Sequence, residues 1–475
     1  MSFREKPCLN YYGGERRTVK MHISDLDMAK KIAEEVHAAG GCAYYVGGYV
    51  RDLIQGNPGK DIDIEIHGIS PDRLKEILSS LGELMEYGES FGIFGLKGHS
   101  IDIAMPRKET CRGRGHRDFD IFVDPHIGTL GAAKRRDFTV NAMMQNVLTG
   151  EIIDHFGGKA DLEAGVIRHV NNESFAEDPL RVLRAAQFAA RFEFSVAKET
   201  VDLCREMDIS ALPKERVMGE LEKALIKADR PSIFFETLKE MNQLSVWFPE
   251  VESLIGVEQN PRYHAEGDVW VHTMMVLDVA SKYSNYSSSK LGFMLSALTH
   301  DFGKAICTER IDGVLHSYAH ETKGLPLVKQ FIERLTGERA LQKYVLNMTE
   351  LHMKPNTMAA MGSSVKSTNK LFDDSCDPEG LICLAICDGL GQITETPYVS
   401  YNAFFRERIA VFHEMMSRPY VMGQDLVDAG IRPDKSFSDY LAYAHKLRLA
   451  GVEKESALKQ TINYAKKHKK ERRHD

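Results

Sequence analysis

The chain has 475 residues, which exceeds one ordinary hydrophobic core and predicts several domains. Hydrophobic residues make up 43% of it and charged residues 27%, a balance typical of a water-soluble globular protein. No apolar run reaches the roughly 18 residues of a membrane span, and the N-terminus has no signal-peptide pattern. A cytoplasmic protein without a membrane partner is therefore expected. The net charge of −7 excludes general attraction to nucleic acid, so any such affinity must come from local basic patches.

The eight cysteines are scattered along the chain and form no CxxC pair. Cys383 and Cys387 have the spacing of one buried helix face. Reduced, structural thiols are therefore expected.

Residues 31–165, after an N-terminal extension (1–30), alternate between short strands and helices and are predicted to form a small head. The pattern predicts strands over 43–46 and 61–66, a helix opened by Ser70 and Pro71, and a hairpin of 93–96 with 101–104. The polar stretch 107–127 is expected to form a loop rather than a packed element.

After about residue 160 the apolar spacing becomes helical. Helices are predicted over 178–192, 201–209, 213–227, 232–241 and, with a break at 430–433, 402–475, with a polar loop over 284–290. The expected fold class is α+β, in which a mixed-sheet head precedes a long all-α body. That body is divided into a neck (166–250), a metal-binding domain (251–400) and a helical tail with a basic C-terminus (401–475).

Two aspartates of the head, Asp61 and Asp63, are two residues apart in a predicted strand, so their carboxylates share one face. Like charges repel there unless a cation lies between them, and Mg²⁺ prefers such oxygens. Asp102, on a predicted neighbouring strand, is a third candidate ligand. Such a site suits activation of a 3′-hydroxyl and clamping of a triphosphate. Taken alone, the Asp-x-Asp pair also fits a solvated strand face that binds no cation.

A glycine pair, Gly47-Gly48, precedes these carboxylates at a strand-to-helix turn, where backbone can approach a phosphate. Gly-Gly-x-x-Arg-Asp followed nine residues later by Asp-x-Asp resembles the head of the DNA polymerase β-like nucleotidyltransferase superfamily. The further order RRDFTxNA and EDxxRxLRAxxFAAR, within residues 40–250, is similar to the class II tRNA nucleotidyltransferases, which are the CCA-adding enzymes and bacterial poly(A) polymerases.

The resemblance implies catalysis by Asp61, Asp63 and Asp102 with Mg²⁺. It also implies a nucleotide-binding set of Gly47, Gly48, Arg51, Asp52, Arg135, Arg136, Asp137, Asn141, Glu177, Asp178, Arg181 and Arg184. Asp52 has a second interpretation, as the charge partner of a helix start. The expected reaction is addition of C and A to a tRNA 3′ end from CTP and ATP, with release of pyrophosphate.

Asp178 and Arg181 are three residues apart, a spacing that places them side by side on a helix. A carboxylate accepts a hydrogen bond from an exocyclic amine and a guanidinium donates to a ring acceptor, a pattern that cytosine and adenine share. The pair is thus a candidate selector of CTP and ATP. Taken alone, it also fits a surface ion pair.

Two residues depart from the family pattern. Gln187 stands where many family members have a basic residue, which would alter the contact with tRNA. Ala132 stands where an acidic residue is common, which would alter the loop that joins the motifs. The loop that begins at 107–109 keeps a family-like length, which favours terminal A addition.

A histidine and aspartate constellation lies in the predicted helical body. The order of these residues resembles the HD phosphohydrolase superfamily: His272, then the doublet His300-Asp301, then Asp388. The linkage of such an HD region to this head resembles the bacterial multifunctional CCA proteins. The resemblance implies that these four residues bind a divalent metal of unspecified identity, with phosphatase or 2′,3′-cyclic phosphodiesterase activity. Lys304, His320 and His352 are further pocket candidates. An inactive HD fold that holds tRNA is the alternative, and residues 421–433 resemble the family's tail segment.

Several readings of function remain open on the sequence. A poly(A) polymerase or a partial CC- or A-adding enzyme would share the same head. An HD phosphodiesterase with an RNA-binding head, or a non-enzymatic tRNA-binding protein, belongs to another class. No obligatory protein partner is evident.

Overall fold

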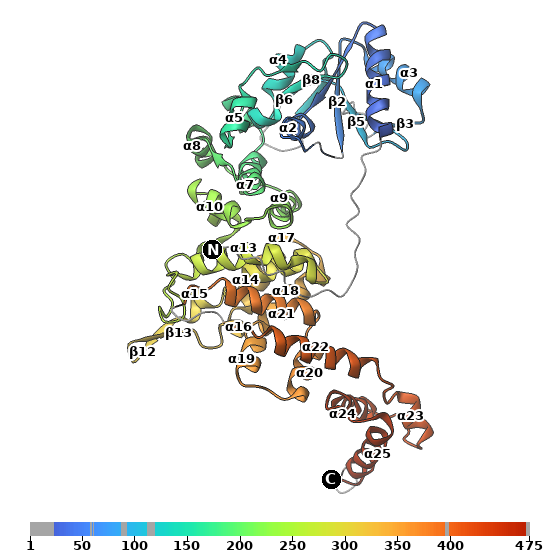
Figure 1. The fold of residues 1–475 in the computed structure, drawn as a ribbon, viewed down its shortest axis with the longest axis vertical. Coiled ribbons are helices and arrows are strands. Elements are labelled where there is room, and N and C mark those ends of the chain that lie inside the picture. Colours follow the sequence, from blue (N-terminus) through green and yellow to red (C-terminus); the bar gives the residue numbers. More distant parts are fainter. Residues whose placement is uncertain are drawn as a thin grey trace. The chain divides into compact units, whose positions relative to one another are not determined.

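A computed structural model describes residues 23–57, 59, 61–86, 93–111, 119–394 and 399–471 (Figure 1). The chain divides after Asp178 into two compact units. This boundary falls inside the segment predicted as the neck, and the finer division into five parts remains a prediction. In the described part of the chain, no helix combines the length and the apolar character needed to cross a bilayer.

The first unit combines one mixed sheet with short helices. Its helices are α1 (Ile23–Ala38), α2 (Gly48–Ile54), α3 (Pro71–Leu81), α4 (Gly128–Lys134), η1 (Thr139–Asn141), α5 (Gly158–Ala164) and α6 (Asn172–Ala176). Its strands are β1 (Cys42–Val46), β2 (Ile62–His67), β3 (Leu84–Glu86), β4 (Ile93–Leu96), β5 (Ile101–Ala104), β6 (Arg107–Cys111), β7 (Phe119–Val123), β8 (Met144–Asn146), β9 (Ile152–Ile153) and β10 (Val166–Ile167).

The main sheet has the strand order β3-β4-β5-β2-β1-β8-β9. Only the central pair of β2 with β5 is parallel, and the other ladders of this sheet are antiparallel. The predicted hairpin is present, since Ile93 pairs with Ala104 and Phe94 with Ile103. Ser70 caps α3 as predicted, because its Oγ accepts from the backbone N–H of Arg73.

Strand β2 explains how the head presents its acids. The side chains of Ile62, Ile64 and Ile66 are fully buried, and α1 packs against this part of the sheet. Because successive residues of a strand point to opposite faces, the intervening acidic residues point to the other face. Burial of the three isoleucines therefore fixes which way the carboxylates project.

The loop predicted over 107–127 is wrong at 107–111 and 119–123, whereas 124–127 contains no helix or strand. Residues 107–111 and 119–123 form an antiparallel two-stranded sheet, β6 with β7. The segment FDIFV is rich in residues with high strand propensity, which outweighs the polar composition around it. The glycines that suggested a loop, Gly113 and Gly115, lie outside the described residues.

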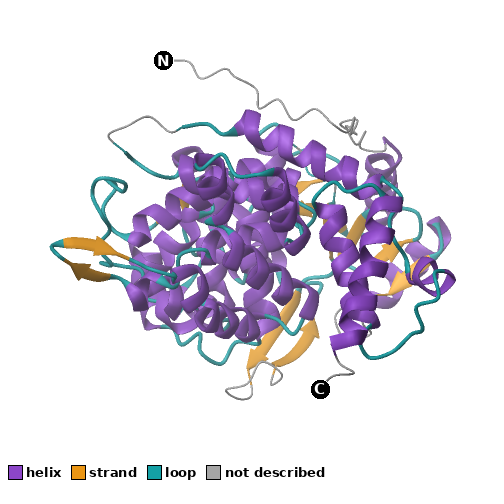
Figure 2. Cartoon of the chain, turned by 90° about the horizontal axis from the view of Figure 1, so that it is seen from below, coloured by secondary structure: helices purple, strands orange, loops and turns teal. Residues whose placement is uncertain are grey.

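The second unit is almost entirely helical (Figure 2). Its helices are α7 (Leu180–Phe192), α8 (Lys198–Glu206), α9 (Lys214–Lys227), α10 (Ser232–Glu240), α11 (Leu244–Trp247), α12 (Pro249–Glu252), α13 (Val269–Tyr283), η2 (Ser284–Tyr286), α14 (Lys290–Thr299), α15 (Lys304–Cys307), α16 (His320–Lys323), α17 (Leu325–Leu335), α18 (Arg339–Leu351), α19 (Lys354–Ala360), α20 (Val365–Asp374), α21 (Pro378–Leu390), α22 (Asn402–Ser417), α23 (Gly423–Asp428), α24 (Phe437–Leu449) and α25 (Lys454–Glu471). Its short strands are β11 (Ser195–Val196), β12 (Glu309–Ile311) and β13 (Val314–His316).

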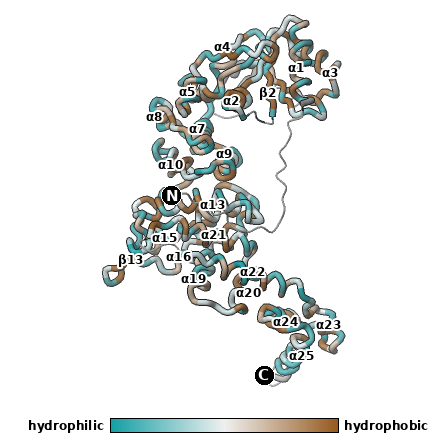
Figure 3. Tube along the Cα trace, in the orientation of Figure 1, coloured by the Kyte–Doolittle hydropathy of each residue, from teal (hydrophilic) through white to brown (hydrophobic). Residues whose placement is uncertain are grey.

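The helices predicted over 213–227 and 232–241 are present as α9 and α10, whereas α8 covers 198–206 instead of 201–209. The stretch 402–475 has further breaks at 418–422 and 450–453, and the predicted loop at 284–290 contains η2. Hydrophobic and hydrophilic residues alternate along the helices of this unit (Figure 3), as expected when each helix buries one face. Helix α7 begins at Leu180 rather than at 178, because Pro179 occupies its N-cap position. The break predicted at 430–433 separates α23 from α24. Six cysteines of the described part are free thiols, in agreement with the prediction.

Candidate functional sites

Three carboxylates converge at the centre of the head sheet. Asp63 of β2 pairs in register with Asp102 of the parallel strand β5, and Asp61 immediately precedes β2. Residues in register on parallel strands project to the same face. Burial raises the pKa of Asp63, the nearby charges of Asp102 and Asp61 raise it further, and Arg136 opposes them. The sequence thus placed these acids together correctly, while their catalytic role stays a prediction.

The turn at Gly47 lies directly beside this carboxylate group. Its φ of 66° is in the left-handed region that favours glycine. A Cβ at this position would lie 3.7 Å from Asp63 Oδ2 and 3.4 Å from an Nη atom of Arg136. The absence of a side chain therefore keeps the space between the turn, the carboxylate and the guanidinium open.

Arg51 connects the Gly-Gly-x-x-Arg-Asp segment to the RRDFTxNA segment inside the head. Its side chain is 3% exposed; Nη1 donates to Asn141 Oδ1 at 2.6 Å and Nε donates to Asp52 Oδ1 at 2.8 Å. Asn141 Nδ2 in turn donates to Asp137 Oδ1 at 3.1 Å. The four predicted residues thus form one network that links α2 to η1.

Glu65 is a head residue that the sequence did not single out. Its carboxylate, 1% exposed, accepts from Arg136 Nη2 at 3.2 Å and lies 2.9 Å from His67 Nε2. Burial acts to raise the pKa of Glu65, but His67 and Arg136 lower it below its usual range. Glu65 continues the alternation of Asp61 and Asp63, and this period was the available signal. It positions Arg136 beside Asp63.

The predicted selector pair does not lie on one helix. Asp178 precedes α7 by two residues, so the helical i, i+3 spacing assumed for Asp178 and Arg181 does not apply. Arg184 lies on α7, with Nη1 4.0 Å from Glu220 Oε1 and its guanidinium 5.3 Å from the Phe188 ring centroid.

Both departures from the family pattern occupy buried positions. Ala132 is fully buried in a small cluster with Val46 and Ala142, where a charged side chain would lack water. Gln187 is 2% exposed, so its replacement concerns the packing of α7 rather than an exposed contact with tRNA.

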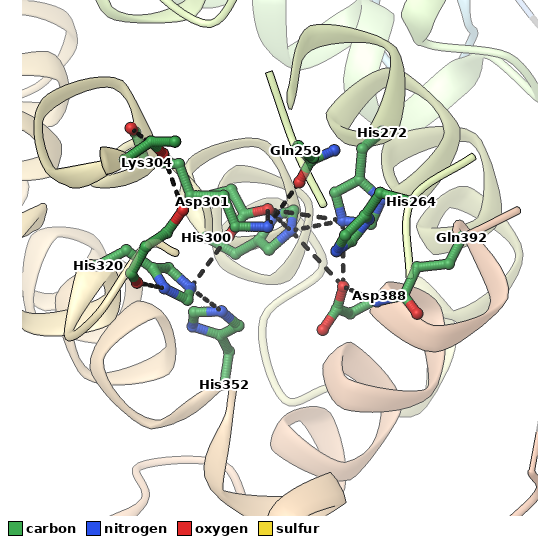
Figure 4. A network of polar contacts seen from close by, with 12 residues as sticks. Gln259, His264, His272, His300, Asp301, Lys304, His320, His352, Asp388 and Gln392 are labelled. Atoms are coloured by element: carbon green, nitrogen blue, oxygen red, sulfur yellow. Dashed lines mark hydrogen bonds and ion pairs between the residues drawn. The ribbon is translucent and has the colours of Figure 1, made fainter. Parts of the chain in front are cut away.

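The metal-ligand candidates of the second unit meet in a buried cluster (Figure 4). His272 comes from α13, the His300-Asp301 doublet follows α14, and Asp388 lies in α21. His272 Nε2 is 3.1 Å from Asp388 Oδ1, 3.4 Å from His300 Nε2 and 3.6 Å from Asp301 Oδ2. All four residues are at most 8% exposed. The structure therefore assembles the set that the sequence pattern predicted.

The other nitrogen of each imidazole lies close to an acceptor, and for His300 this contact is a hydrogen bond. His300 Nδ1 lies 2.8 Å from the Ala297 carbonyl, and His272 Nδ1 lies 3.1 Å from Glu266 Oε1. A carbonyl only accepts, so His300 Nδ1 carries a proton and donates it, whereas His272 Nδ1 approaches the Glu266 carboxylate outside hydrogen-bond geometry; both Nε2 atoms face the cluster. Metal-binding histidines are usually held in this way.

The charges of the cluster are strongly coupled. Burial lowers the pKa of His272, but the carboxylates of Asp388 and Glu266 outweigh burial and raise it to about 9. Burial raises the pKa of Asp388, yet His272 and His300 hold it well below its usual range. Burial and the imidazoles of His300 and His320 lower the pKa of His352 to about 3. A cation fits this donor set.

The remaining pocket candidates surround Asp301. Lys304 Nζ lies 2.7 Å from Asp301 Oδ2, outside hydrogen-bonding geometry, and donates to Gln259 Oε1 at 2.8 Å. His320 Nε2 lies 3.1 Å from Asp301 Oδ1, and His352 is adjacent to it. The sequence missed Gln259 and Glu266, because single polar residues outside a motif give no local signal.

The mixed sheet with its helices defines a nucleotidyltransferase head, and a long, largely helical region that contains the buried histidine and aspartate cluster follows it. The sequence matches the family described as "Poly A polymerase head domain" over residues 43–168. It also matches "Probable RNA and SrmB- binding site of polymerase A" over residues 193–255.

Relatives with the name multifunctional CCA protein extend this match over most of the chain. The protein of Nitrosococcus oceani is 34% identical over 405 residues, covering 82% of this chain and 93% of that protein. The protein of Actinobacillus pleuropneumoniae is 36% identical over 326 residues, covering 67% and 77%. The chain therefore belongs to the class II CCA-adding enzyme and poly(A) polymerase family, and it is a tRNA nucleotidyltransferase.

Solved structures agree on the fold. A CCA-adding enzyme in its apo form II has a TM-score of 0.65 at 20% identity, covering 93% of this chain and 96% of that one. The Thermotoga maritima CCA-adding enzyme in complex with a tRNA has a TM-score of 0.61 at 21% identity, covering 92% and 95%. These similarities extend to both the sheet-containing head and the helical part.

Proposed function

We propose that this enzyme adds C and A to the 3′ end of tRNA from CTP and ATP without a template, releasing pyrophosphate. The observation that carries the proposal is the convergence of Asp61, Asp63 and Asp102 on one face of the head sheet. Relatives that share most of this chain have the name multifunctional CCA protein, which also supports it.

Mg²⁺ fits the three carboxylates, since they are oxygen ligands whose mutual repulsion a divalent cation offsets. Held by Asp61, Asp63 and Asp102, it would activate the 3′-hydroxyl and neutralise charge on the triphosphate. Arg136, which lies beside Asp63 and is fixed by Glu65, offers a guanidinium to the phosphates. Catalysis of this kind rests mainly on positioning and electrostatic stabilisation.

Base selection in this proposal involves Glu177, Asp178 and Arg181. A carboxylate that accepts from an exocyclic amine and a guanidinium that donates to a ring nitrogen together fit cytosine and adenine. Uracil and guanine present a different pattern to the same pair. Asp178 precedes α7, so its carboxylate is not placed by the helical i, i+3 spacing.

For the second unit we propose a metal-dependent phosphohydrolase. His272, His300, Asp301 and Asp388 would hold a divalent ion, which supplies an activated water for attack on a phosphate ester. Lys304 lies at the edge of this set, where its ammonium can bind a phosphate oxygen. A buried cluster of charges is costly without a ligand, which supports a bound ion at this site.

The addition reaction is tested with purified protein, Mg²⁺ and tRNAs that end at the discriminator base, at C or at CC. Each tRNA is offered one labelled nucleotide at a time. Stepwise gain of C, C and A supports the proposal. Unlimited A addition selects a poly(A) polymerase, and addition that stops at CC or occurs only on CC ends selects a partial enzyme. No incorporation, with hydrolysis of 2′,3′-cyclic phosphate ends, selects a hydrolase with an RNA-binding head.

A further inference from the structure

A buried carboxylate, that of Glu65, lies on the face of β2 that carries Asp63. Within the sheet, Glu65 stands between its register partners Tyr44 of β1 and Ala104 of β5. Its side chain is 1% exposed, so water solvates it very little. A buried carboxylate without a partner is costly, and cations or hydrogen-bond donors must therefore lie close to it.

The two oxygens of Glu65 have different partners. Oε1 lies 2.9 Å from His67 Nε2, and Oε2 accepts from Arg136 Nη2 at 3.2 Å. The His67 side chain is 8% exposed, and its ring packs edge-on against Tyr44 with the centroids 5.2 Å apart. Because both oxygens are engaged and the imidazole is packed in place, the carboxylate cannot turn without losing a buried contact.

The guanidinium that Glu65 holds also borders the proposed magnesium site. Nη1 of Arg136 and Oδ2 of Asp63 both lie within 4 Å of the point where a Cβ on Gly47 would stand. Opposite charges this close attract each other strongly where water is scarce. Of the described acidic side chains, however, Glu65 is the one that forms an ion pair with Arg136. The guanidinium is thus drawn toward the buried acid and not onto Asp63.

A guanidinium placed on Asp63 would interfere with nucleotide addition. Arginine binds carboxylates through paired N–H···O bonds, which would occupy the oxygens that Mg²⁺ requires. The same bonds would engage the N–H groups that can bind phosphate. In its observed position the Arg136 side chain is 25% exposed and remains accessible to a ligand.

We propose that Glu65 is a positioning residue for nucleotide addition. It holds the Arg136 guanidinium away from Asp61 and Asp63, which leaves their oxygens to Mg²⁺ and the other N–H groups of Arg136 to the triphosphate. His67 supports this role by fixing the second oxygen of the carboxylate. The inference rests on the proposed nucleotide-addition site and adds a residue that controls both its metal and its nucleotide affinity.

The test uses the full chain and tRNAs that end in C or CC, with CTP or ATP, over a range of nucleotide and Mg²⁺ concentrations. Glu65→Gln keeps the shape of the side chain and removes its charge, so Arg136 is released toward Asp63. We expect the KM for the nucleotide and the half-saturating Mg²⁺ concentration each to rise about 10-fold or more, as when other supporting partners of metal sites are lost. A purely structural loss would lower kcat through the folded fraction and leave both concentrations unchanged.

Glu83→Gln is the matched control, because Glu83 pairs with Lys97 at an exposed position of the same head. It should leave both concentrations within about twofold of the parent. If the parent adds nucleotide and Glu65→Gln behaves as Glu83→Gln does, the inference is overturned and the proposed addition reaction stands. A parent that adds no nucleotide overturns both.

Arg136→Ala shows whether Glu65 acts through the guanidinium. In that background Glu65→Gln should change either concentration by less than about twofold, since the group that Glu65 holds is gone. Equal factors in the two backgrounds overturn the inference. Calorimetric titration with nucleotide and Mg²⁺ makes the same comparison at equilibrium where turnover is too slow to measure.

His67→Phe is a second variant, which leaves the carboxylate in place. It keeps a ring against Tyr44 and removes the imidazole nitrogen beside Glu65. Both concentrations should rise by about two- to fivefold, as expected for one lost hydrogen bond. Thermal unfolding of each variant reports whether the head still folds. If Glu65→Gln unfolds in the assay, parent-like concentrations in a folded His67→Phe overturn the inference.

Discussion

The Arg51 guanidinium and the Asn141 side chain form a 2.6 Å hydrogen bond between residues 90 positions apart in the chain. Because Arg51 is buried, the acceptors Asn141 and Asp52 stabilise its charged guanidinium. The bond ties the glycine-pair helix to the segment that carries Arg136 and Asp137. It thereby makes the nucleotide-binding motifs one structural unit.

Replacing Asn141 with alanine should damage both stability and catalysis. A buried guanidinium that loses an acceptor costs about 1–3 kcal/mol, and the motif it orients is misplaced. We expect the free energy of unfolding to fall by that amount and nucleotide addition to fall at least about tenfold. Urea unfolding and a primer-extension assay measure the two effects.

Asn146→Ala is the control for this change. Asn146 Oδ1 accepts from the backbone of Leu148 and Thr149 in an exposed turn. Its loss should lower stability slightly while leaving nucleotide addition within about twofold. Equal activity in Asn141→Ala and Asn146→Ala would contradict a role for the network in the site.

Gly47→Ala should lower nucleotide addition beyond its effect on stability. The substitution imposes a left-handed φ on alanine, at about 1–3 kcal/mol, and places a methyl group beside Asp63 and Arg136. Gly98→Ala imposes a similar φ at a turn with open space around it. Both variants should lose comparable stability, but only Gly47→Ala should lose activity, by about tenfold or more. Matching activities in the two would show that the turn is merely structural.

Glu266→Gln should weaken metal binding in the helical unit. Glu266 Oε1 faces the Nδ1 atoms of both His272 and His264 and so orients a proposed ligand. Loss of such a partner typically lowers metal affinity about 10–100-fold. Titration with Mn²⁺ measures the change, and nucleotide addition should be unaffected. Glu258→Gln, at an exposed ion pair with Arg310, is the control that should bind as the parent does.

Alkaline pH should destabilise the second unit through Cys204. Burial raises the pKa of this thiol from about 9 to about 12, so the folded state keeps it neutral where the unfolded chain ionises it. Its stabilising contribution is complete below pH 9 and is lost as the pH rises toward 12. The expected slope is up to about 1.4 kcal/mol per pH unit. Urea unfolding at pH 8 to 10.5 measures this slope, and Cys204→Ala should reduce it; an unchanged slope would contradict the assignment.

Local sequence patterns predicted the strands and helices that carry the site residues, but they predicted the side-chain contacts between these elements less well. The strict alternation in β2 predicted that Asp61 and Asp63 share one face of the sheet. Because the alternating isoleucines are buried on one face, the two carboxylates must point to the other. The start of α7 was wrong because Pro179 was taken as helix interior rather than as its cap. The β6–β7 ladder was missed because its strands are short and partly polar.

The contacts of the supporting residues could not be identified from spacing, although the alternation of β2 places Glu65 on the same face as Asp63. Glu65 and Glu266 act through tertiary contacts with Arg136 and His272, and neither belongs to a motif. His320 and His352 were recognised only as pocket candidates. Their shared contact with Asp301 depends on the close approach of the His320 backbone to Gly303, which no sequence period indicates.

The most direct test of two separate active sites is a paired assay of two variants, with nucleotide addition and 2′,3′-cyclic phosphate hydrolysis measured on the same preparations. Asp61→Ala should abolish addition and leave hydrolysis at the parent rate. His300→Ala should abolish hydrolysis and leave addition unchanged. Loss of both activities in either correctly folded variant would contradict the assignment of each reaction to its own cluster.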